Sequence, residues 1–180
     1  MKVTETKLKG CFVIEPRVFN DDRGYFFESY NKEKFEELTG SKVDFVQDNE
    51  SFSTKGVLRG LHFQKGEHAQ SKLVRVTHGE VLDVAVDIRP DSKTFLQVVT
   101  ERLSAENKKQ LFVPRGFAHG FIVLSDTVVF NYKCDNFYNK ASEGGIIYND
   151  ETLKINWILD SKEFLVSEKD LVLPTVKELF

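Results

Sequence analysis

The chain has 180 residues, 41% of them hydrophobic and 29% charged, a composition typical of a globular protein, and we expect one domain spanning residues 1–180. The formal net charge of −3 argues against a nucleic-acid-binding protein that uses a basic surface. No apolar run approaches the ~20 residues that a membrane helix needs. The first ten residues do not resemble a signal peptide, and Cys11 and Cys134 are too few for a disulfide framework. We therefore expect a cytoplasmic protein with free thiols and neither nucleic-acid nor membrane partners.

Few segments have the pattern of a helix. The clearest is 31–38, where Asn31 suits the N-cap, apolar residues are spaced three apart, and Gly40 follows as a stop signal. A short helical turn is expected over 104–109, and another near the C-terminal end. The remaining chain is rich in Phe, which favours strands and apolar pockets.

Most of the other segments have the pattern of strands. Two pairs of strands flank two-residue loops, which predicts two hairpins: Lys72–Thr77 with Glu80–Ile88 around His78-Gly79, and Ala118–Leu124 with Thr127–Cys134 around Ser125-Asp126. Many short strands with tight turns predict an all-β fold, a sandwich or barrel of jelly-roll type with a few short peripheral helices.

Alternation along strand 80–88 predicts the face of each side chain. Leu82, Val84, Val86 and Ile88 should share one face, and Val81, Asp83, Ala85 and Asp87 the other.

The expected hairpins bring polar groups together. With two-residue loops, His119 lies opposite Tyr132, and Lys72 lies one diagonal step from Asp83 on the same face. Burying such groups unpaired costs a few kcal/mol each, so they favour the lining of a pocket over a packed core. Asp83 could orient the Lys72 ammonium, or the two could form a purely structural ion pair.

Two segments, Gly56–His62 and Pro114–His119, look like the two halves of the cupin barrel signature. Metal-binding cupins continue the first half as His-x-His, whereas this chain reads His62-Phe63-Gln64. Because a catalytic metal needs about three protein ligands, we expect a metal-free site with no cofactor that works by general acid/base chemistry. A metal-dependent cupin using His62, His119 and a distant carboxylate stays as an alternative. His68 and His78 are expected at the surface.

Motifs along the whole chain resemble those of the dTDP-4-dehydrorhamnose 3,5-epimerases. In family order they are Asn20–Glu28, Gln47–Ser51, Gly56–Gln64, Lys72–Val76, Pro114–Ser125, Tyr132-Lys133, Tyr138, Glu143–Ile146 and Ser167–Asp170. One departure is Phe63, where the family often has Tyr. The resemblance implies a cupin-type jelly-roll β-barrel.

The resemblance implies four catalytic residues. His62 matches the base that removes a proton beside the C4 ketone, and Asp170 matches the carboxylate that orients that imidazole and raises its basicity. Tyr132 matches the acid on the opposite face of the sugar, and Lys72 matches the cation near the C4 oxygen. These roles agree with the chemistry, because inversion needs deprotonation on one face and reprotonation on the other.

The resemblance also implies a substrate-binding set: Arg23, Phe26, Glu28, Gln47, Asp48, Asn49, Arg59, His119, Tyr138, Glu143 and Lys169. Arg23 and Arg59 suit a pyrophosphate, and Tyr138 matches a ring that stacks on thymine. In the family, the segment from Arg23 to Glu28 reaches into the neighbouring subunit's site, so a homodimer with a shared sheet is expected.

The activity implied is inversion of C3 and C5 in dTDP-4-keto-6-deoxy-D-glucose, through an enolate, on the route to dTDP-L-rhamnose. Three alternatives stay open: an epimerase that acts on C3 only of a related nucleotide-linked 4-keto-6-deoxyhexose, a metal-dependent cupin enzyme, and a sugar-binding cupin without catalysis.

Overall fold

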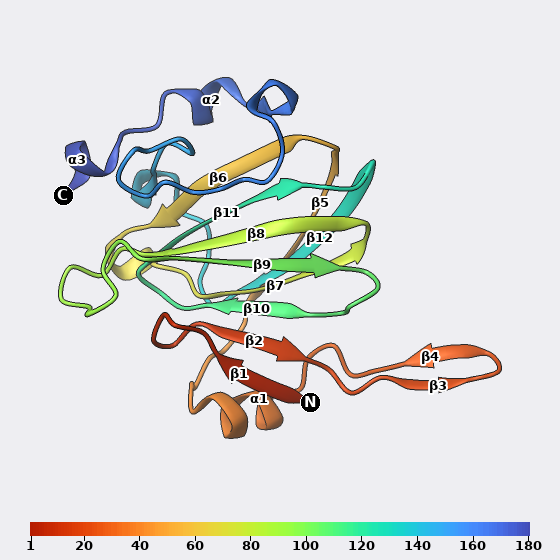
Figure 1. Ribbon diagram of the computed structural model, residues 1–180. Helices are drawn as coiled ribbons and strands as arrows, with labels where there is room; N and C mark the ends of the chain where they lie inside the picture. Colours follow the sequence, from red (N-terminus) through yellow and green to blue (C-terminus); the bar gives the residue numbers. More distant parts are fainter.

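Two β-sheets packed face to face form the body of the computed structural model, which describes residues 1–180 (Figure 1). In the first sheet the strands are ordered β1 (Lys2–Glu5), β2 (Phe12–Glu15), β10 (Gln110–Val113), β7 (Lys72–His78), β12 (Thr127–Cys134) and β5 (Gln47–Thr54). In the second they are ordered β13 (Glu143–Gly145), β6 (Val57–Gln64), β11 (Phe117–Val123), β8 (Glu80–Asp87) and β9 (Val98–Ser104). A short strand, β14 (Leu165–Val166), pairs in parallel with β6. The predicted all-β jelly roll is confirmed.

Short helices lie at the ends of this body. The predicted first helix is confirmed as α1 (Lys32–Thr39): Asn31 Oδ1 accepts a hydrogen bond from the Lys34 amide at 3.1 Å, and Gly40 ends the helix with a φ of 68°. The predicted C-terminal helix is confirmed as α3 (Val176–Leu179). A further helix, α2 (Glu168–Leu171), precedes it, and 3₁₀ turns occupy Gly66–His68, Lys140–Ser142 and Ser161–Glu163. None of the helices combines the length and the apolar character needed to cross a membrane.

The helical turn predicted over 104–109 is present only as a single turn, in which the Lys108 amide donates to the Ser104 carbonyl oxygen at 3.0 Å, and no helix forms. Strand β9 ends at Ser104, and one hydrogen-bonded turn leads to β10. Ser104 Oγ accepts from the Asn107 amide at 3.0 Å, and Asn107 Oδ1 accepts from the Ser104 amide at 3.1 Å. Lys108 then adopts a φ of 55°, which ends the turn.

Both predicted hairpins are wrong, because each loop carries the chain from one sheet to the other. Strand β7 pairs with β10 and β12 in the first sheet, whereas β8 pairs with β11 and β9 in the second. Strands β11 and β12 are separated in the same way. The two loops meet, since the Glu80 amide donates to Ser125 Oγ at 2.8 Å. A two-residue polar loop has the same local pattern whether it joins paired strands or switches sheets.

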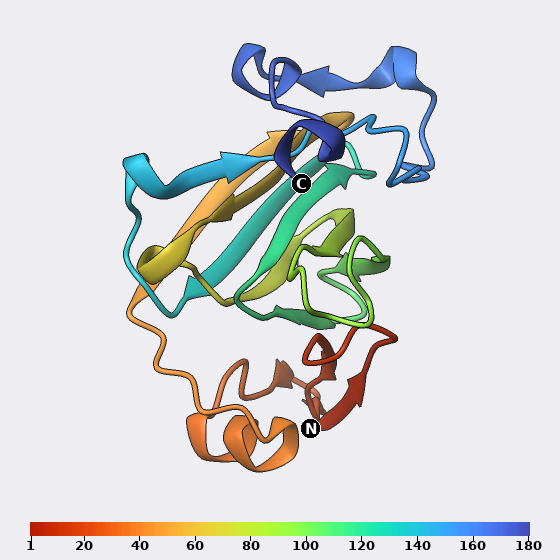
Figure 2. The ribbon, with the colours of Figure 1, turned by 90° about the vertical axis from the view of Figure 1, so that its left-hand side faces the viewer.

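Although the hairpins are wrong, the side chains of β8 alternate between its two faces as predicted. The alternation expected for β8 is confirmed: Val81 and Ala85 belong to the core between the sheets. Leu82, Val84 and Val86 pack on the other face, against Trp157 and other residues of the C-terminal segment. The N-terminal strands and α1 lie at one end of the molecule and the C-terminal segment at the other (Figure 2).

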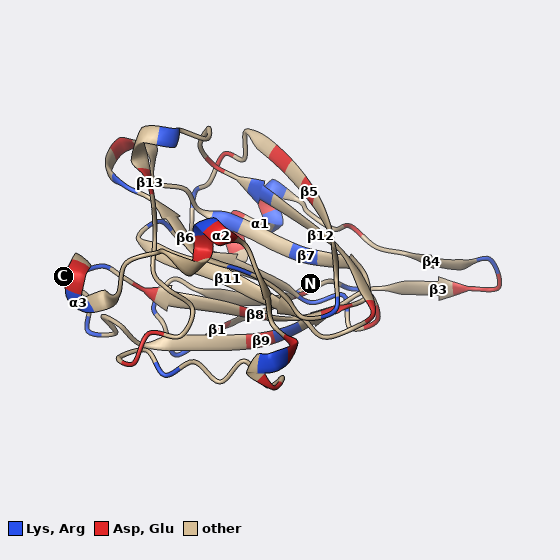
Figure 3. Cartoon of the chain, turned by 90° about the horizontal axis from the view of Figure 1, so that it is seen from above, with Lys and Arg blue, Asp and Glu red and all other residues tan.

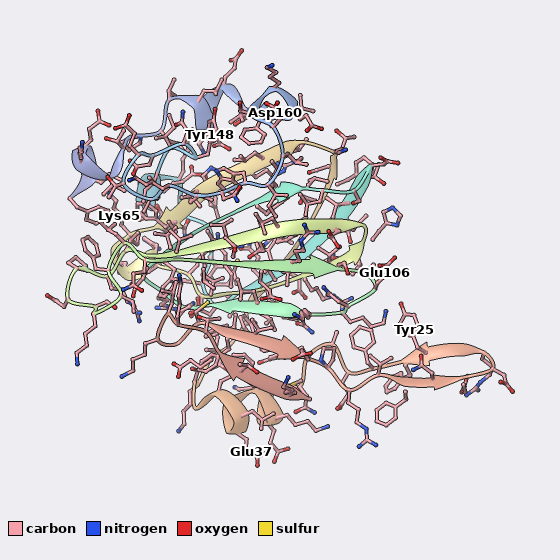
Figure 4. All side chains as sticks on the ribbon, viewed as in Figure 1. Tyr25, Glu37, Lys65, Glu106, Tyr148 and Asp160 are labelled. Carbon is pink, nitrogen blue, oxygen red and sulfur yellow. The ribbon has the colours of Figure 1, made fainter.

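A two-stranded hairpin projects from the body (Figure 1). It consists of β3 (Phe19–Asp21) and β4 (Gly24–Phe26), and all of its residues are exposed. Tyr25 stands on it, away from the side chains that fill the space between the sheets (Figure 4). Its turn carries charges of both signs (Figure 3).

The backbone conformation of Gly79, in the loop between β7 and β8, predicts the effect of a substitution there. Gly79 has a φ of 77°, and a Cβ there would lie 2.1 Å from the Thr127 carbonyl oxygen. We expect Gly79→Ala to lower the free energy of unfolding by about 2–4 kcal/mol in a denaturant titration, since it combines a strained φ with a backbone clash. Gly66→Ala is the control, because Gly66 has a φ of 61° with no atom within 4 Å. An equal loss of unfolding free energy in the two variants would show that the close packing around Gly79 does not contribute to stability.

Candidate functional site

Residues from both sheets line a cavity of about 440 Å³ between them. Its polar lining is Ser51, Arg59, His62, Lys72, His119, Tyr132, Ser167, Lys169 and Asp170, and its apolar lining includes Val57, Phe121, Phe130 and Leu165. An adjoining cavity of about 390 Å³ is lined by Gln47, Asn49, Gln64, Tyr138 and Glu143, among others. Three side chains, His62, Lys72 and Tyr132, line both cavities and therefore stand at their junction.

An irregularity in β6 brings two of the predicted residues to the same face. Opposite β11, His62 pairs with His119 and Arg59 with Phe121, so β6 has one more residue than its partner between the pairs. In a regular strand, residues three apart point to opposite faces, whereas here Arg59 and His62 both line the cavity. The backbones approach closely at this point, since a Cβ on Gly60 would lie 2.7 Å from Gly120 Cα.

The predicted pairing of His62 with Asp170 is present. His62 Nε2 lies 2.7 Å from Asp170 Oδ1, and the Gly60 amide donates to Asp170 Oδ2 at 3.3 Å. The Asp170 side chain is buried on the short helix α2, which Ser167 caps. Because an ionised carboxylate only accepts, the network assigns the proton to Nε2 and leaves the lone pair on Nδ1. No other protein group bonds that ring, so Nδ1 is the atom able to take a proton.

Burial controls the charge of His62. Removal from water lowers the pKa of His62 below 6.5, and this effect is larger than the opposing influence of Asp170, which raises it. The nearby Lys72 ammonium lowers the pKa of His62 further. The expected gain in basicity from Asp170 is therefore outweighed, and the imidazole is neutral at pH 7.

Lys72 and Tyr132 face His62 from the first sheet. Lys72 Nζ lies 5.8 Å from the centre of the Tyr132 ring, and neither side chain has a hydrogen-bond partner within the chain. Burial lowers the pKa of Lys72 and raises the pKa of Tyr132. The site thus has a neutral imidazole on one wall and a protonated phenol on the opposite wall. Beside the phenol is Lys72, whose charged form is disfavoured by burial and favoured by Asp83 and Glu143, among others.

The predicted contact of Asp83 with Lys72 is wrong. Strand β8 lies beside β11 rather than β7, so the carboxylate of Asp83 faces His119, whose Nε2 lies 2.9 and 3.0 Å from its two oxygens. Nor does His119 pair with Tyr132 across a hairpin. The two residues reach one cavity from opposite sheets.

Other predicted binding residues gather around the two cavities. Arg59 Nε donates to Ser53 Oγ at 3.2 Å, and Gln47 Nε2 donates to Asn49 Oδ1 at 2.9 Å. At the opening, Glu143 accepts from Tyr138 Oη at 3.1 Å and from Lys169 Nζ at 2.6 Å.

Four predicted binding residues lie outside the cavities. Asp48 points to the other side of β5, where Lys133 Nζ donates to it at 2.8 Å. Arg23 is 90% exposed and pairs with Asp21 on the projecting hairpin. Phe26 is exposed on the same hairpin, and Glu28 pairs with Lys34 beside α1.

Several lining residues were not predicted. Phe121 and Phe130 stack with ring centroids 4.2 Å apart and form an apolar wall of the cavity. Period-two alternation from His119 and Tyr132 could have indicated them. His68 and His78 lie outside both cavities. The chain contains no group of three His, Cys, Asp or Glu side chains placed to hold a metal ion.

The His62 pair allows a direct titration. We expect NMR to give His62 a pKa below 6.5, and Asp170→Asn to lower it further, because this substitution removes the carboxylate that favours the charged ring. The exposed His78 serves as an internal reference in the same spectra. A His62 pKa that rises in Asp170→Asn would contradict the assigned interaction.

Comparisons with known proteins agree along the whole chain. A family model described as dTDP-4-dehydrorhamnose 3,5-epimerase matches residues 5–178. A protein of that name from Escherichia coli K12 is 55% identical over 179 residues, which cover 99% of this chain and 96% of the relative. The crystal structure of the epimerase of that name from Elizabethkingia anophelis is 59% identical, with a TM-score of 0.96 and coverage of 99% and 97%. A dTDP-6-deoxy-D-glucose-3,5-epimerase from Legionella pneumophila, solved with dTDP-4-keto-L-rhamnose, is 46% identical, with a TM-score of 0.95 and coverage of 99% and 94%.

Proposed function

The chain belongs to the dTDP-4-dehydrorhamnose 3,5-epimerase family of carbohydrate epimerases. We propose that its His62 and Tyr132 invert C3 and C5 of dTDP-4-keto-6-deoxy-D-glucose. The observation that carries the assignment of these residues is their position on opposite walls of one cavity. The product is the 4-keto precursor of dTDP-L-rhamnose.

Proton removal begins on the wall formed by the second sheet. His62 Nδ1 carries the free lone pair and takes a proton from the carbon beside the C4 ketone, whose carbonyl acidifies that proton. The electron pair moves into an enolate, which places negative charge on the C4 oxygen. Lys72 has no partner in the chain, so its ammonium is available to stabilise that oxygen.

Inversion is completed from the other wall. Tyr132 Oη gives its proton to the same carbon from the opposite face, which restores the ketone with the other configuration. His62 then carries the abstracted proton and Tyr132 is a phenolate, and exchange with solvent in the open cavity returns both to their starting states. Arg59 lowers the pKa of Tyr132, against the larger effect of burial, and so eases loss of the phenolic proton.

The remaining cavity residues suit a nucleotide diphosphate. Arg59 can form charge-assisted hydrogen bonds to the pyrophosphate. Tyr138 is 57% exposed at the opening and offers a ring face to thymine. Gln47, Asn49 and the Glu143–Lys169 pair supply further polar contacts around it.

The projecting hairpin supports a homodimer. Arg23 and Phe26 cannot serve the cavity of their own chain, and Phe19, Tyr25 and Phe26 expose 51%, 60% and 67% of their surface. Exposed aromatic side chains on an extended segment are typical of an interface. In a dimer related by two-fold symmetry, each hairpin would complete the partner subunit's cavity with Arg23, Phe26 and Glu28.

The reaction is tested with dTDP-4-keto-6-deoxy-D-glucose in deuterated water. We expect NMR to show deuterium at both C3 and C5 and an inverted product. His62→Ala should lower the rate of exchange at both carbons by about 10²–10⁴-fold, because it removes the base. Tyr132→Phe should retain some exchange but fail to deliver inverted product. Label at C3 alone would show a C3-only epimerase, and normal turnover by Tyr132→Phe would overturn the acid assignment.

The shared site is tested by mixing two impaired variants. An Arg23→Ala chain retains a functional His62, and a His62→Ala chain retains a functional hairpin. After subunits exchange, mixed dimers should regain one complete site each, or about a quarter of the wild-type activity for equal amounts. Activity that stays at the sum of the two separate variants would contradict a shared site.

A further inference from the structure

Two cations of the body contact the base of the projecting hairpin. Lys108, in the turn between β9 and β10, places its Nζ 4.0 Å from the centre of the Tyr25 ring and 6.0 Å from that of Phe27. The Arg75 guanidinium, on β7, lies 5.7 Å from the centre of the Phe27 ring. The centres of the two rings are 6.0 Å apart. Figure 4 shows Tyr25 near the end of the sheets where Glu106 marks the same turn.

Both cations are available to the rings. Neither Lys108 nor Arg75 forms an ion pair, and the Lys108 ammonium donates only to the Ala105 carbonyl oxygen, at 2.8 Å. The next residue differs, since the Lys109 ammonium pairs with Glu101 at 2.6 Å. Because side-chain hydrogen bonds hold the turn, it presents Lys108 to the hairpin from a fixed position.

The contacts hold one side of the hairpin and leave its other side free. Side chains alternate along β4, so Phe26 points away from the side on which Tyr25 and Phe27 meet the cations. Phe26 is exposed, and Arg23 in the turn of the hairpin pairs only with Asp21. The side chains expected in the partner subunit's cavity are therefore those that the body of their own chain does not hold.

A hairpin of this size needs contacts at its base to keep a direction. Strands β3 and β4 have three residues each, and all six are exposed. An isolated two-stranded hairpin is only marginally stable in water. Just beyond β4, Gln110 Nε2 donates to the Ser29 carbonyl oxygen at 2.6 Å and fixes the point where the chain returns to the first sheet. The cation–π contacts then set the angle at which the hairpin leaves that point.

We propose that Lys108 and Arg75 are positioning residues that fix the direction of the projecting hairpin, so that Arg23 and Phe26 reach the partner subunit's cavity. This inference rests on the shared site of the proposed function. A segment that is already oriented loses less conformational entropy on binding than one that moves freely. The base and the acid lie on the sheets, away from the hairpin. Loss of the cations should therefore weaken substrate binding and leave proton transfer unchanged.

The role of Lys108 is tested by kinetics with dTDP-4-keto-6-deoxy-D-glucose. Lys108→Met keeps a long side chain and removes its charge. We expect KM to rise by about 3–10-fold, the effect of one partly exposed cation–π contact, with kcat within about twofold of wild type. Tyr25→Leu, which removes the ring, should raise KM in the same way, and the double variant should not add to either single one. Lys108→Arg retains a cation and should retain the wild-type KM.

Lys109→Met is the matched control. It removes the adjacent charge, which pairs with Glu101 instead of a ring, so it should leave KM and kcat unchanged. The same KM in Lys108→Met and Lys109→Met would overturn the inference, as would a fall in kcat without a rise in KM.

Mixed dimers test which cavity the positioned hairpin serves. When Arg23→Ala and His62→Ala chains are mixed, the complete site combines His62 of the first chain with the hairpin of the second. Lys108→Met added to the His62→Ala chain should raise the KM of the mixture, whereas Lys108→Met added to the Arg23→Ala chain should not. An equal KM in the two mixtures would overturn the positioning role alone. Absence of activity in the mixture without Lys108→Met would instead overturn the shared site, and the inference with it.

Discussion

The hydrogen bond between Asp170 and His62 joins the two parts of the chain on which the site depends. Asp170 belongs to a short helix near the C-terminus, and His62 follows the irregular Gly60–Leu61 step of β6. Because Asp170 also accepts from the Gly60 amide, one carboxylate holds both the ring and the backbone that aims it. The C-terminal segment, which packs on the outer face of the second sheet, is thereby connected to the proposed base inside the barrel.

Burial also shifts the pKa of the titratable groups in the cavity. Removal from water lowers the pKa of His62 and Lys72 and raises the pKa of Tyr132. Two of these shifts suit the proposed reaction: a neutral imidazole can accept a proton, and a phenol keeps its proton until the enolate needs it. A cation without a partner in the chain interacts strongly with charge that develops inside a water-poor cavity. The same burial that forms the core between the sheets thus suits the proposed base and acid, whereas the charged form of Lys72 is favoured against burial by Asp83 and Glu143, among others.

Local patterns in the sequence predicted what depends on local forces. The caps of α1 at Asn31 and Gly40, and the alternation along β8, follow from a few neighbouring residues and were confirmed. The pairing of strands depends on residues far apart in the chain, and the loops at His78-Gly79 and Ser125-Asp126 show why it was missed. Their short polar sequences suit a hairpin, but neither loop can show that the next strand enters the facing sheet.

For the site, the sequence indicated the residues but not the contacts that depend on strand pairing. Resemblance to the family indicated His62, Lys72, Tyr132 and Asp170, and the structure brings all four to one cavity. The hairpin registers that placed Tyr132 opposite His119 and Lys72 beside Asp83 were wrong. The partner of Asp83 could not be found, because it depends on β8 lying beside β11. The extra residue in β6 was equally hidden, since strict alternation would have separated Arg59 from His62.

The central claim is that imidazole and phenol act on the sugar from opposite sides. The most direct measurement is a crystal structure of this chain with dTDP-4-keto-L-rhamnose bound. The account predicts His62 Nδ1 over one face of the hexose, Tyr132 Oη over the other, and the C4 oxygen beside Lys72. A complex with both rings on one face of the hexose, or with the sugar outside the cavity, would contradict it.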